Sequence, residues 1–360
     1  MKNNSKKMRR KKVLVALSGG IDSSVSAILL KEHGYDLIGI TLRMHNSNYY
    51  RTDPLAQSIK DASILANRLQ IPYYVIDVQN EFNQIVINNF IDEYQIGRTP
   101  NPCALCNPEI KWKSLIEIKN EFSCNYIATG HYAQINKSNG RFFISKAKDE
   151  TKDQSYFLWR LNQKELEKTI FPLGSYKKEE IKKIAASKGF NIIASKKESY
   201  NICFIPEGDY RKYFKELSIT KNNSRTGKFV NTSGQYLGDH SGIENYTVGQ
   251  RKGLEIFNEE TLYVTKIISK DNVIVLGHKN ELVQDQLIVK SFNLSKYNSI
   301  PQNVRICSKL NYKGTIIDCE IRQKNKQLIL NFETPVLAIS PGQSIAFYEG
   351  NDLIGGGIID

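Results

Sequence analysis

The segment from Val13 to Ser24 constrains the fold of this chain more than any other part of its sequence. A short β-branched run, Val13–Leu17, leads into Ser18-Gly19-Gly20-Ile21-Asp22-Ser23-Ser24, and apolar residues at helical spacing follow. Glycines let the backbone approach a ligand, and a helix N-terminus presents unpaired N–H groups with a positive dipole end. We therefore predict a pyrophosphate cradle. The alternative is a plain turn with a Ser or Asp cap, and a Walker loop is excluded because no Gly-Lys-Ser/Thr follows.

Strand-like and helix-like segments alternate through the first third of the chain. After Val13–Leu17, strands are predicted at Leu37–Leu42, Tyr73–Val78 and Tyr126–Thr129. Helices are predicted at Ser23–Lys31, Asp61–Leu69, Phe82–Tyr94 and Trp112–Phe122. This alternation is typical of an α/β fold whose parallel sheet is covered on both faces. Ligands of such sheets bind beyond the carboxyl ends of the strands.

The pattern changes after Phe204, where turn residues become frequent and helical periodicity fades. From Gln286 onward, short alternating strands are separated by polar turns, at Val304–Leu310, Gly314–Arg322, Gln327–Phe332 and Ser344–Tyr348. This pattern predicts a small antiparallel β-barrel. We expect a basic disordered arm at 1–12, a catalytic domain at 13–208, a small β-rich central domain at 209–285 and the barrel at 286–360.

The charge balance of the chain favours a polyanionic partner. The formal net charge is +13 and the pI about 9.2, and Lys or Arg side chains that meet phosphates release condensed counterions. A basic surface that serves only solubility is the alternative. No apolar run is long enough to span a membrane, and the start of the chain lacks the apolar stretch of a signal peptide. We therefore expect a cytoplasmic protein.

The chain has six cysteines, which in a cytoplasm should be reduced thiols. Cys124, Cys307 and Cys319 lie alone in apolar surroundings, so we interpret them as small core residues. Cys103 and Cys106 belong to Gly97-Arg98-Thr99-Pro100-Asn101-Pro102-Cys103-Ala104-Leu105-Cys106-Asn107.

The two prolines of this Cys-x-x-Cys motif predict an extended, stiff loop that leads into a helix with Lys111 and Lys113. A thiol near a helix N-terminus and basic residues would have a lowered pKa. A redox pair is another interpretation. Half of a zinc site is disfavoured, because no second Cys-x-x-Cys or His-x₃-His pair exists. A three-cysteine iron–sulfur site with Cys203 is the main competitor.

Cys203 lies in a third motif, Ser199-Tyr200-Asn201-Ile202-Cys203-Phe204-Ile205. Alone, this motif would indicate a buried cysteine in an apolar strand. Beside the cradle and the Cys-x-x-Cys motif, it indicates a second thiol that handles sulfur.

Together these motifs resemble those of the bacterial tRNA 2-thiouridylase family, within the ATP pyrophosphatase superfamily. The resemblance covers nearly the whole chain, and further matching segments are Ala128–Tyr132, Lys152–Phe157, Thr247–Leu254, Pro341–Ser344 and Gly355–Ile359. It implies an ATP pyrophosphatase domain (adenine nucleotide alpha hydrolase-like), a small central domain and a C-terminal barrel. It also implies that ATP adenylates the C2 oxygen of the wobble uridine in tRNA. Persulfide sulfur then replaces that oxygen, giving 2-thiouridine, AMP and pyrophosphate.

The resemblance also implies roles for matching residues. ATP would be bound by Ala16, Leu17, Ser18, Gly19, Gly20, Ile21, Asp22, Ser23, Leu42 and Gly130. Asp22 would help to hold Mg²⁺ or the phosphates. The target base would meet Asn101, Pro102 and Cys103, and tRNA would contact His131, Lys152, Asp153, Gln154, Asn311, Tyr312 and Gln343. Cys106 would be the nucleophile and Cys203 the persulfide carrier, with a transient disulfide between them. The sulfur would come from a persulfide donor protein of a relay fed by a cysteine desulfurase, and the chain would be a monomer.

Two positions depart from the family pattern. Cys103 stands where the family usually has Asp, so a carboxylate near the target base is missing. Either a water or another residue does its work, or Cys103 takes part in the sulfur chemistry. Asn311-Tyr312 stands where the barrel commonly has Arg-Tyr, although Lys309 and Lys313 flank it. Two other classes of function remain open. An ATP ligase that forms a C–N bond would use the cradle without the cysteines, and a non-enzymatic RNA-binding protein would need neither.

Overall fold

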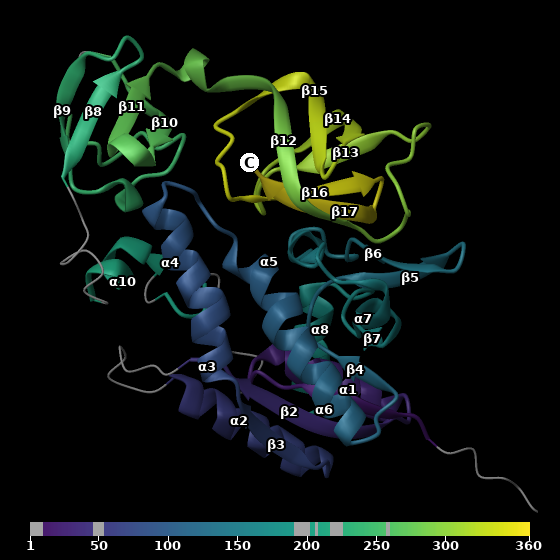
Figure 1. Ribbon diagram of the computed structural model, residues 1–360. Helices are drawn as coiled ribbons and strands as arrows, with labels where there is room; N and C mark the ends of the chain where they lie inside the picture. Colours follow the sequence, from purple (N-terminus) through teal and green to yellow (C-terminus); the bar gives the residue numbers. More distant parts are fainter. Residues whose placement is uncertain (1–9, 46–53, 191–201, 206–207, 217–225, 257–259) are drawn as a thin grey trace, which may run out of the picture. The chain divides into compact units, whose positions relative to one another are not determined.

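The computed structural model describes residues 10–45, 54–190, 202–205, 208–216, 226–256 and 260–360 (Figure 1). The expected basic arm up to residue 9 and the motif residues Ser199, Tyr200 and Asn201 lie outside the described residues. The chain divides into two compact units. The first consists of Met1–Asn80, Pro108–Ser155 and Asn162–Glu198, and the second of Glu81–Asn107, Tyr156–Leu161 and Ser199–Asp360.

The described part of the first unit contains five strands in a parallel sheet of order β3-β2-β1-β4-β7. Their bounds are β1 Lys12–Ala16, β2 Asp36–Arg43, β3 Tyr73–Asp77, β4 Tyr126–Ala128 and β7 Thr169–Ile170. Val13, Leu14 and Val15 are fully buried, as expected for an apolar run in a central parallel strand. The chain moves outward from β1 through β2 to β3 and then returns to β4 on the other side of β1. The strand order therefore reverses beside β1, which is where open α/β sheets bind ligands.

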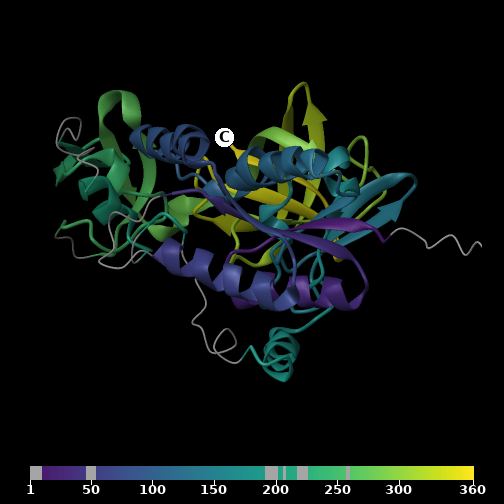
Figure 2. The same cartoon turned by 90° about the horizontal axis from the view of Figure 1, so that it is seen from below.

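Helices cover both faces of this sheet, as predicted. The first unit contains α1 Ile21–Glu32, α2 Pro54–Leu69, α6 Lys113–Glu121, α7 Gln163–Glu167 and α8 Lys178–Ser187, and the β-hairpin of β5 Gln134–Ser138 and β6 Arg141–Ser145. Figure 2 shows α1 and α2 on one face and α6 on the other. Val25, Ile28 and Leu29 of α1 are buried in the core, and each such side chain contributes about 1.5–3 kcal/mol. None of the described helices is long and apolar enough to cross a membrane.

The helical part of the second unit differs from the sequence prediction. It comprises α3 Gln79–Phe82 (whose first residues belong to the first unit), the π-helical segment η1 Asn83–Ile87, α4 Asn88–Gln95, α5 Pro102–Cys106 and α10 Tyr210–Glu216. The extended loop predicted for the Cys-x-x-Cys motif is wrong beyond Asn101, because a helix begins at Pro102 and continues through the π-helical η2, Asn107–Trp112, into α6. Proline is well suited to the first helical position, and Asn101 is a good cap. The prediction also missed α10.

Two β-structures complete the second unit. The described residues form a four-stranded sheet of order β10-β11-β8-β9, with β8 Gly227–Asn231, β9 Tyr236–His240, β10 Tyr263–Ile268 and β11 Val273–Gly277. Six further strands pair in the order β12-β15-β14-β13-β16-β17, and β12 also pairs with β17, which closes the predicted barrel. They are β12 Val283–Leu294, β13 Ile306–Lys309, β14 Ile316–Lys324, β15 Gln327–Leu337, β16 Ser344–Glu349 and β17 Asp352–Ile359. Short 3₁₀ turns lie at Ser155–Phe157, Ile243–Asn245, Ser269–Asp271 and Lys279–Leu282.

Close packing in the barrel explains a glycine of the last strand. A Cβ on Gly356 would lie 2.5 Å from the Ile345 carbonyl oxygen and 2.6 Å from the Trp159 indole. Of the three lone cysteines, Cys124 and Cys319 are buried, as predicted, whereas Cys307 is partly exposed. Its thiol lies 3.1 Å from an Asp318 carboxylate oxygen.

Candidate functional site

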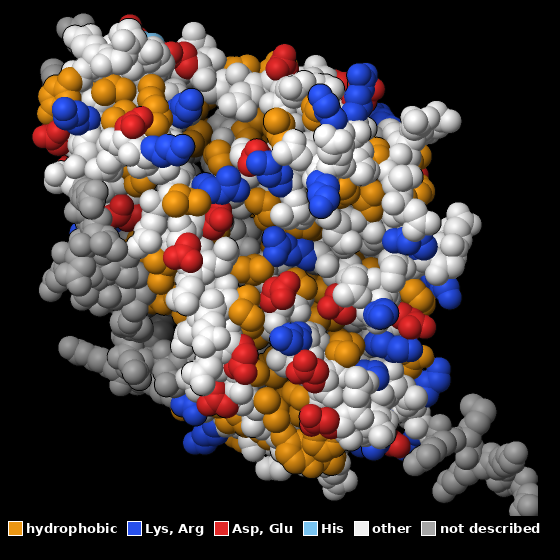
Figure 3. Space-filling view, in the orientation of Figure 1, with side chains coloured by type: hydrophobic (Ala, Val, Ile, Leu, Met, Phe, Trp, Pro, Cys, Tyr) orange, Lys and Arg blue, Asp and Glu red, His pale blue; other side chains and the backbone are white. Residues whose placement is uncertain are grey.

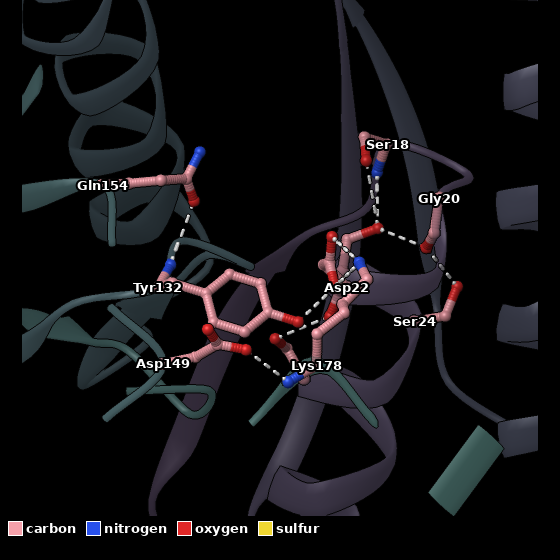
Figure 4. Close-up of polar contacts among 10 residues, drawn as sticks. Ser18, Gly20, Asp22, Ser24, Tyr132, Asp149, Gln154 and Lys178 are labelled. Atoms are coloured by element: carbon pink, nitrogen blue, oxygen red, sulfur yellow. Dashed lines mark hydrogen bonds and ion pairs between the residues drawn. The ribbon is translucent and has the colours of Figure 1, made fainter. Parts of the chain in front are cut away.

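The loop between β1 and α1 has the geometry of an anion cradle. Gly19 has a φ of +70°, and a Cβ there would lie 2.3 Å from the Ser58 carbonyl oxygen, so only glycine fits. The Ser23 hydroxyl accepts a hydrogen bond from the Ser18 amide and donates one to the Gly20 carbonyl, both at 3.1 Å (Figure 4). The Ser24 hydroxyl also donates to Gly20, at 2.8 Å. These bonds fix the loop at the N-terminus of α1, and a helix N-terminus is a favourable place for an anion.

The other predicted ATP-binding residues lie around this loop. A Cβ on Gly130 would lie 2.8 Å from the Ser23 amide nitrogen, so the end of β4 touches the first turn of α1. Leu42 lies near the carboxyl end of β2, and the neighbouring Thr41 hydroxyl donates to the Leu17 carbonyl at 2.6 Å. The structure therefore brings the predicted ATP-binding set to adjacent carboxyl ends of β1, β2 and β4. Their contact with ATP remains a prediction.

An ion pair that the sequence reasoning missed lies at the first turn of α1. The Lys178 ammonium is 2.7 and 2.8 Å from the two carboxylate oxygens of Asp22, and the Tyr132 hydroxyl donates to the same carboxylate at 2.7 Å (Figure 4). The Lys178 backbone amide donates to the Asp149 carboxylate at 2.8 Å, which fixes the start of α8. The Lys178 side chain is only 8% exposed, whereas that of Asp22 is 34% exposed.

His131 is held in place by aromatic rings. Its ring lies 5.5 Å from that of Trp112 and 6.1 Å from that of Phe171, and its Nδ1 is 2.8 Å from the Thr129 hydroxyl. Although the residue is partly exposed, burial of the imidazole, with a smaller effect of Lys111, lowers the pKa of His131 to about 3. The imidazole is therefore neutral at physiological pH and can meet RNA only as a neutral group.

This lowered pKa predicts how the stability of the protein depends on pH. The unfolded state takes up a proton near pH 6.5, whereas the folded state does so only near pH 3. The contribution of the neutral His131 side chain to the free energy of unfolding is therefore full above pH 6.5. It is lost as the pH falls toward 3, at up to about 1.4 kcal/mol per pH unit. We expect His131→Gln to lose less stability than the wild type between about pH 7.5 and about pH 5.5 in denaturant titrations. Equal losses would contradict the neutral imidazole.

The segment predicted to contact tRNA in the first unit forms an internally bonded loop. The buried Asp153 carboxylate accepts hydrogen bonds from the Ala147 amide at 3.0 Å and the Ser155 hydroxyl at 2.7 Å. The Gln154 side chain accepts from the Tyr132 amide at 3.0 Å. Lys152 is half-buried. The loop thus supports Tyr132, and contact of these residues with tRNA remains a prediction.

In the second unit, the chain before the cysteine pair is fixed to the barrel. The Arg98 guanidinium donates to the Ile359 carbonyl at 3.1 Å, and the Thr99 amide donates to the Pro341 carbonyl at 2.7 Å. The Asn101 side chain then caps α5 by accepting from the Ala104 amide at 3.2 Å.

This cap decides which of the two thiols lies near a helix N-terminus. Pro102 is the first residue of α5 and Cys103 the second, so Cys103 has the position expected for a helix-stabilised thiol. Cys106 ends α5 and is 5% exposed.

Cys203 lies in an exposed turn and not in a buried strand. The turn is closed by the Ile205 amide, which donates to the Ile202 carbonyl at 3.0 Å. The next residue, Phe204, packs edge-on against Phe82 and Phe90, with ring centroids 5.7 and 5.4 Å apart. α5 packs on η1, between those two phenylalanines in the sequence. The segments that hold Cys106 and Cys203 thus both pack on the continuous helix formed by α3, η1 and α4, within one unit.

Two of the three barrel residues predicted to contact tRNA lie around a cleft of about 540 Å³ in the second unit. Asn311 and Gln343 line it, together with Thr99. Tyr312 packs on Phe157 with ring centroids 4.6 Å apart, and the Lys309 ammonium lies 5.5 Å from the Tyr312 ring. The cleft brings two predicted RNA contacts to the segment that leads into α5. Their role stays a prediction.

The donor set for an iron–sulfur cluster is not assembled. In the part of the chain that the structure describes, no three His, Cys, Asp or Glu side chains lie where they could hold a metal ion, and Cys103, Cys106 and Cys203 are all described. The three-cysteine alternative is not favoured.

Family models match three consecutive regions. They are described as a tRNA methyl transferase HUP domain at residues 11–207, a tRNA methyl transferase PRC-barrel domain at 218–278 and an aminomethyltransferase beta-barrel domain at 284–359. With the glycine-rich loop at the strand-order reversal, they define a HUP-type, ATP-binding tRNA-modifying protein with two β-domains.

Full-length relatives identify the family. The tRNA-specific 2-thiouridylase MnmA of Amoebophilus asiaticus is 43% identical over 98% of this chain and 96% of its own length. That of Cytophaga hutchinsonii is 43% identical over 98% of both chains, and that of Lachnoclostridium phytofermentans is 41% identical over 97% and 99%. The chain belongs to the tRNA-specific 2-thiouridylase family. The domain descriptions speak of methyl transfer, but the two cysteine motifs fit thiolation.

Proposed function

We propose that this chain is a tRNA 2-thiouridylase that activates the wobble uridine with ATP and replaces its C2 oxygen with sulfur carried on Cys203. The observation that carries the proposal is that one chain holds a phosphate cradle in its first unit and two cysteines on a common helical support in its second, and that the relatives compared above are 2-thiouridylases over nearly its full length. A C–N ligase would need the cradle but no cysteine pair. A binding protein would need neither.

The first step activates a poor leaving group. The uracil O2 attacks the α-phosphorus of ATP, a C2–O–P bond forms, and the bond to pyrophosphate breaks with its electron pair. The N–H groups at the start of α1, with Ser18 and Ser23, hold the departing pyrophosphate. Mg²⁺ bound with ATP would supply charge neutralisation, and such an ion usually takes few protein ligands. Asp22 already accepts three hydrogen bonds, so it would offer the ion a single oxygen site at most.

The second step transfers sulfur. The Cys106 thiolate attacks the inner sulfur of the Cys203 persulfide, a disulfide forms, and hydrosulfide leaves. Hydrosulfide adds at C2, and the C2–O bond breaks to release AMP. A thiol reductant then restores both cysteines, as a cytoplasm permits. The exposed position of Cys203 supports loading by the persulfide donor protein of a relay that begins at a cysteine desulfurase.

The reacting base must leave its stack. A single-stranded anticodon loop allows this at low cost, and the unstacked uracil presents its edge to protein groups. Asn101, Pro102 and Cys103 are the residues proposed to meet it. Because Cys103 stands where the family usually has a carboxylate, a water or another residue would do the work of that carboxylate, or Cys103 would take part in the sulfur chemistry.

Nucleoside mass spectrometry tests the proposal. Unmodified tRNA is incubated with the protein, Mg-ATP and sulfide, in air and again without oxygen. We expect 2-thiouridine under both conditions, with one AMP formed for each base. Activity only without oxygen would favour an iron–sulfur route. Cleavage of ATP to AMP without any thiouridine would favour the C–N ligase.

The affinity for tRNA should depend steeply on salt. Figure 3 shows Lys and Arg side chains at many places on one face, with Asp and Glu between them, and the net charge is +13. If six or more phosphates are contacted, affinity should fall about 10³-fold between about 50 and 200 mM salt. Filter binding at several salt concentrations measures the slope. A flat dependence would contradict a role of the positive charge in RNA binding.

A further inference from the structure

Lys178 has no assigned role, yet its ammonium lies at the first turn of α1 in the cradle. It is delivered from the start of α8, 156 positions along the chain from Asp22. The Asp149 carboxylate fixes its backbone amide at 2.8 Å, and the Tyr132 ring lies 5.6 Å from its ammonium. Three segments far apart in sequence therefore converge to place one positive charge.

The two side chains of this ion pair, Lys178 and Asp22, are buried to different extents, and this difference indicates a function. The lysine is the enclosed partner, at 8% exposure, and the carboxylate at 34% is the accessible one. Enclosing an ammonium costs several kcal/mol unless a counter-charge and hydrogen bonds compensate for the lost water. Asp22 supplies the counter-charge and the hydrogen bonds, and the Tyr132 ring lies beside the ammonium. The arrangement keeps a dehydrated cation in place beside the loop.

The charge balance of the cradle requires such a cation. A helix N-terminus presents about half a positive charge, while the Asp22 carboxylate brings a full negative charge to the same turn. Lys178 offsets that negative charge. A lysine ammonium is a compact point charge with three rotatable donors, which suits phosphate oxygens.

We propose that Lys178 is a phosphate-binding residue of the cradle, and that Asp22 and Tyr132 are positioning residues that hold its ammonium toward the β- and γ-phosphates of ATP. This inference rests on the proposed ATP-dependent function. It assigns Asp22 a main role through Lys178, with direct binding of Mg²⁺ as the alternative.

Calorimetric titration of the full chain with three probes separates phosphate binding from general damage. The probes are ATP, pyrophosphate and AMP, each with and without Mg²⁺, and AMP lacks the phosphates that Lys178 would hold. We expect Lys178→Met to lower the affinity for ATP and for pyrophosphate about 10- to 100-fold, because one charge-assisted contact is lost. AMP affinity should change less than about threefold. Lys178→Arg should recover part of the loss.

Lys177→Met is the matched control, because this neighbouring lysine is exposed and has no proposed role. It should leave all three affinities unchanged. Asp22→Asn should weaken pyrophosphate with and without Mg²⁺, since it acts through the lysine. A loss confined to the Mg²⁺ titrations would overturn that assignment in favour of metal binding.

Several outcomes would overturn the role of Lys178. These are an equal loss of AMP affinity, unchanged ATP affinity in Lys178→Met, or no recovery in Lys178→Arg. If Lys178→Met does not fold, Lys178→Gln and the arginine variant carry the same comparison. A wild-type chain that binds neither ATP nor pyrophosphate would instead contradict the proposed function itself.

Discussion

Replacing Cys203 or Cys106 by serine is expected to reduce 2-thiouridine formation by at least about a thousandfold when sulfur is supplied by cysteine and a cysteine desulfurase. A serine hydroxyl at 203 cannot carry a persulfide, and one at 106 is not ionised at neutral pH and cannot attack it. Binding of ATP and tRNA should persist, because the cradle does not include either residue. Nucleoside mass spectrometry measures the loss, and calorimetry measures binding.

Supplying sulfide directly makes the test sharper. Hydrosulfide enters after the step that needs the two thiols, so both variants should regain thiolation with sulfide. Cys307→Ser is the control, since Cys307 lies on β13 and bonds to Asp318; it should behave like the wild type. Full activity of Cys106→Ser with the desulfurase would show that the assigned nucleophile is wrong. Loss of activity together with bound iron in Cys103→Ser would favour the cluster.

Gly130→Ala is expected to weaken ATP binding at least about tenfold, because overpacking against a rigid neighbour costs about 1–3 kcal/mol. The new Cβ would lie 2.8 Å from the Ser23 amide nitrogen and 3.0 Å from the Asp22 carbonyl carbon. Both atoms are backbone in the first turn of α1, so relief would require the cradle itself to move. Calorimetric titration with Mg-ATP measures the effect.

Gly140→Ala is the matched control for this substitution. Gly140 lies in the β5–β6 turn with a φ of +77°, and a Cβ there meets nothing within 4 Å. It should lower stability slightly because of its backbone conformation, while ATP affinity stays unchanged. An ATP affinity that falls equally in both variants would mean that Gly130 acts through general stability and not through the cradle.

Local patterns predicted four of the five strands described in the parallel sheet, the barrel and the glycine-rich loop, but missed the two-residue strand β7. Val13–Leu17 is apolar throughout because β1 is buried on both faces, and the Ser18–Ser24 loop follows it directly. In β13 and in the first half of β15, residues alternate between core and surface, so period-two patterning located these strands. The predicted strand Ser344–Tyr348 in β16 is instead buried throughout. Most of the residues predicted to bind ATP are contiguous, so a single local motif named them; their contact with ATP stays a prediction.

Long-range contacts were beyond this reasoning. Lys178 and Asp22 are joined only by tertiary structure, and nothing around Lys178 distinguishes it from the neighbouring lysines of a charged helix. Tyr132 belongs to the motif Ala128–Tyr132, but the hydrogen bond from its hydroxyl to Asp22 depends on the tertiary structure. At Pro102 the prediction overvalued proline as a helix breaker, although Asn101 before it was a readable start signal.

The π-helical segment η1 sets the directions of Phe82 and Phe90, the two rings that support the residue after Cys203, and so determines which changes in its length this helix tolerates. Phe82 and Phe90 are eight positions apart, so in a regular α-helix they would point about 80° away from each other. A π-turn accommodates one extra residue, which leaves about seven regular steps and brings both rings to within about 20° of one direction. Both rings can then pack against Phe204, the residue that follows Cys203. Deleting one residue from η1 would leave seven regular α-helical steps and keep both rings on one side, whereas inserting one would rotate a ring by about 100°. A deletion here should therefore be tolerated better than an insertion.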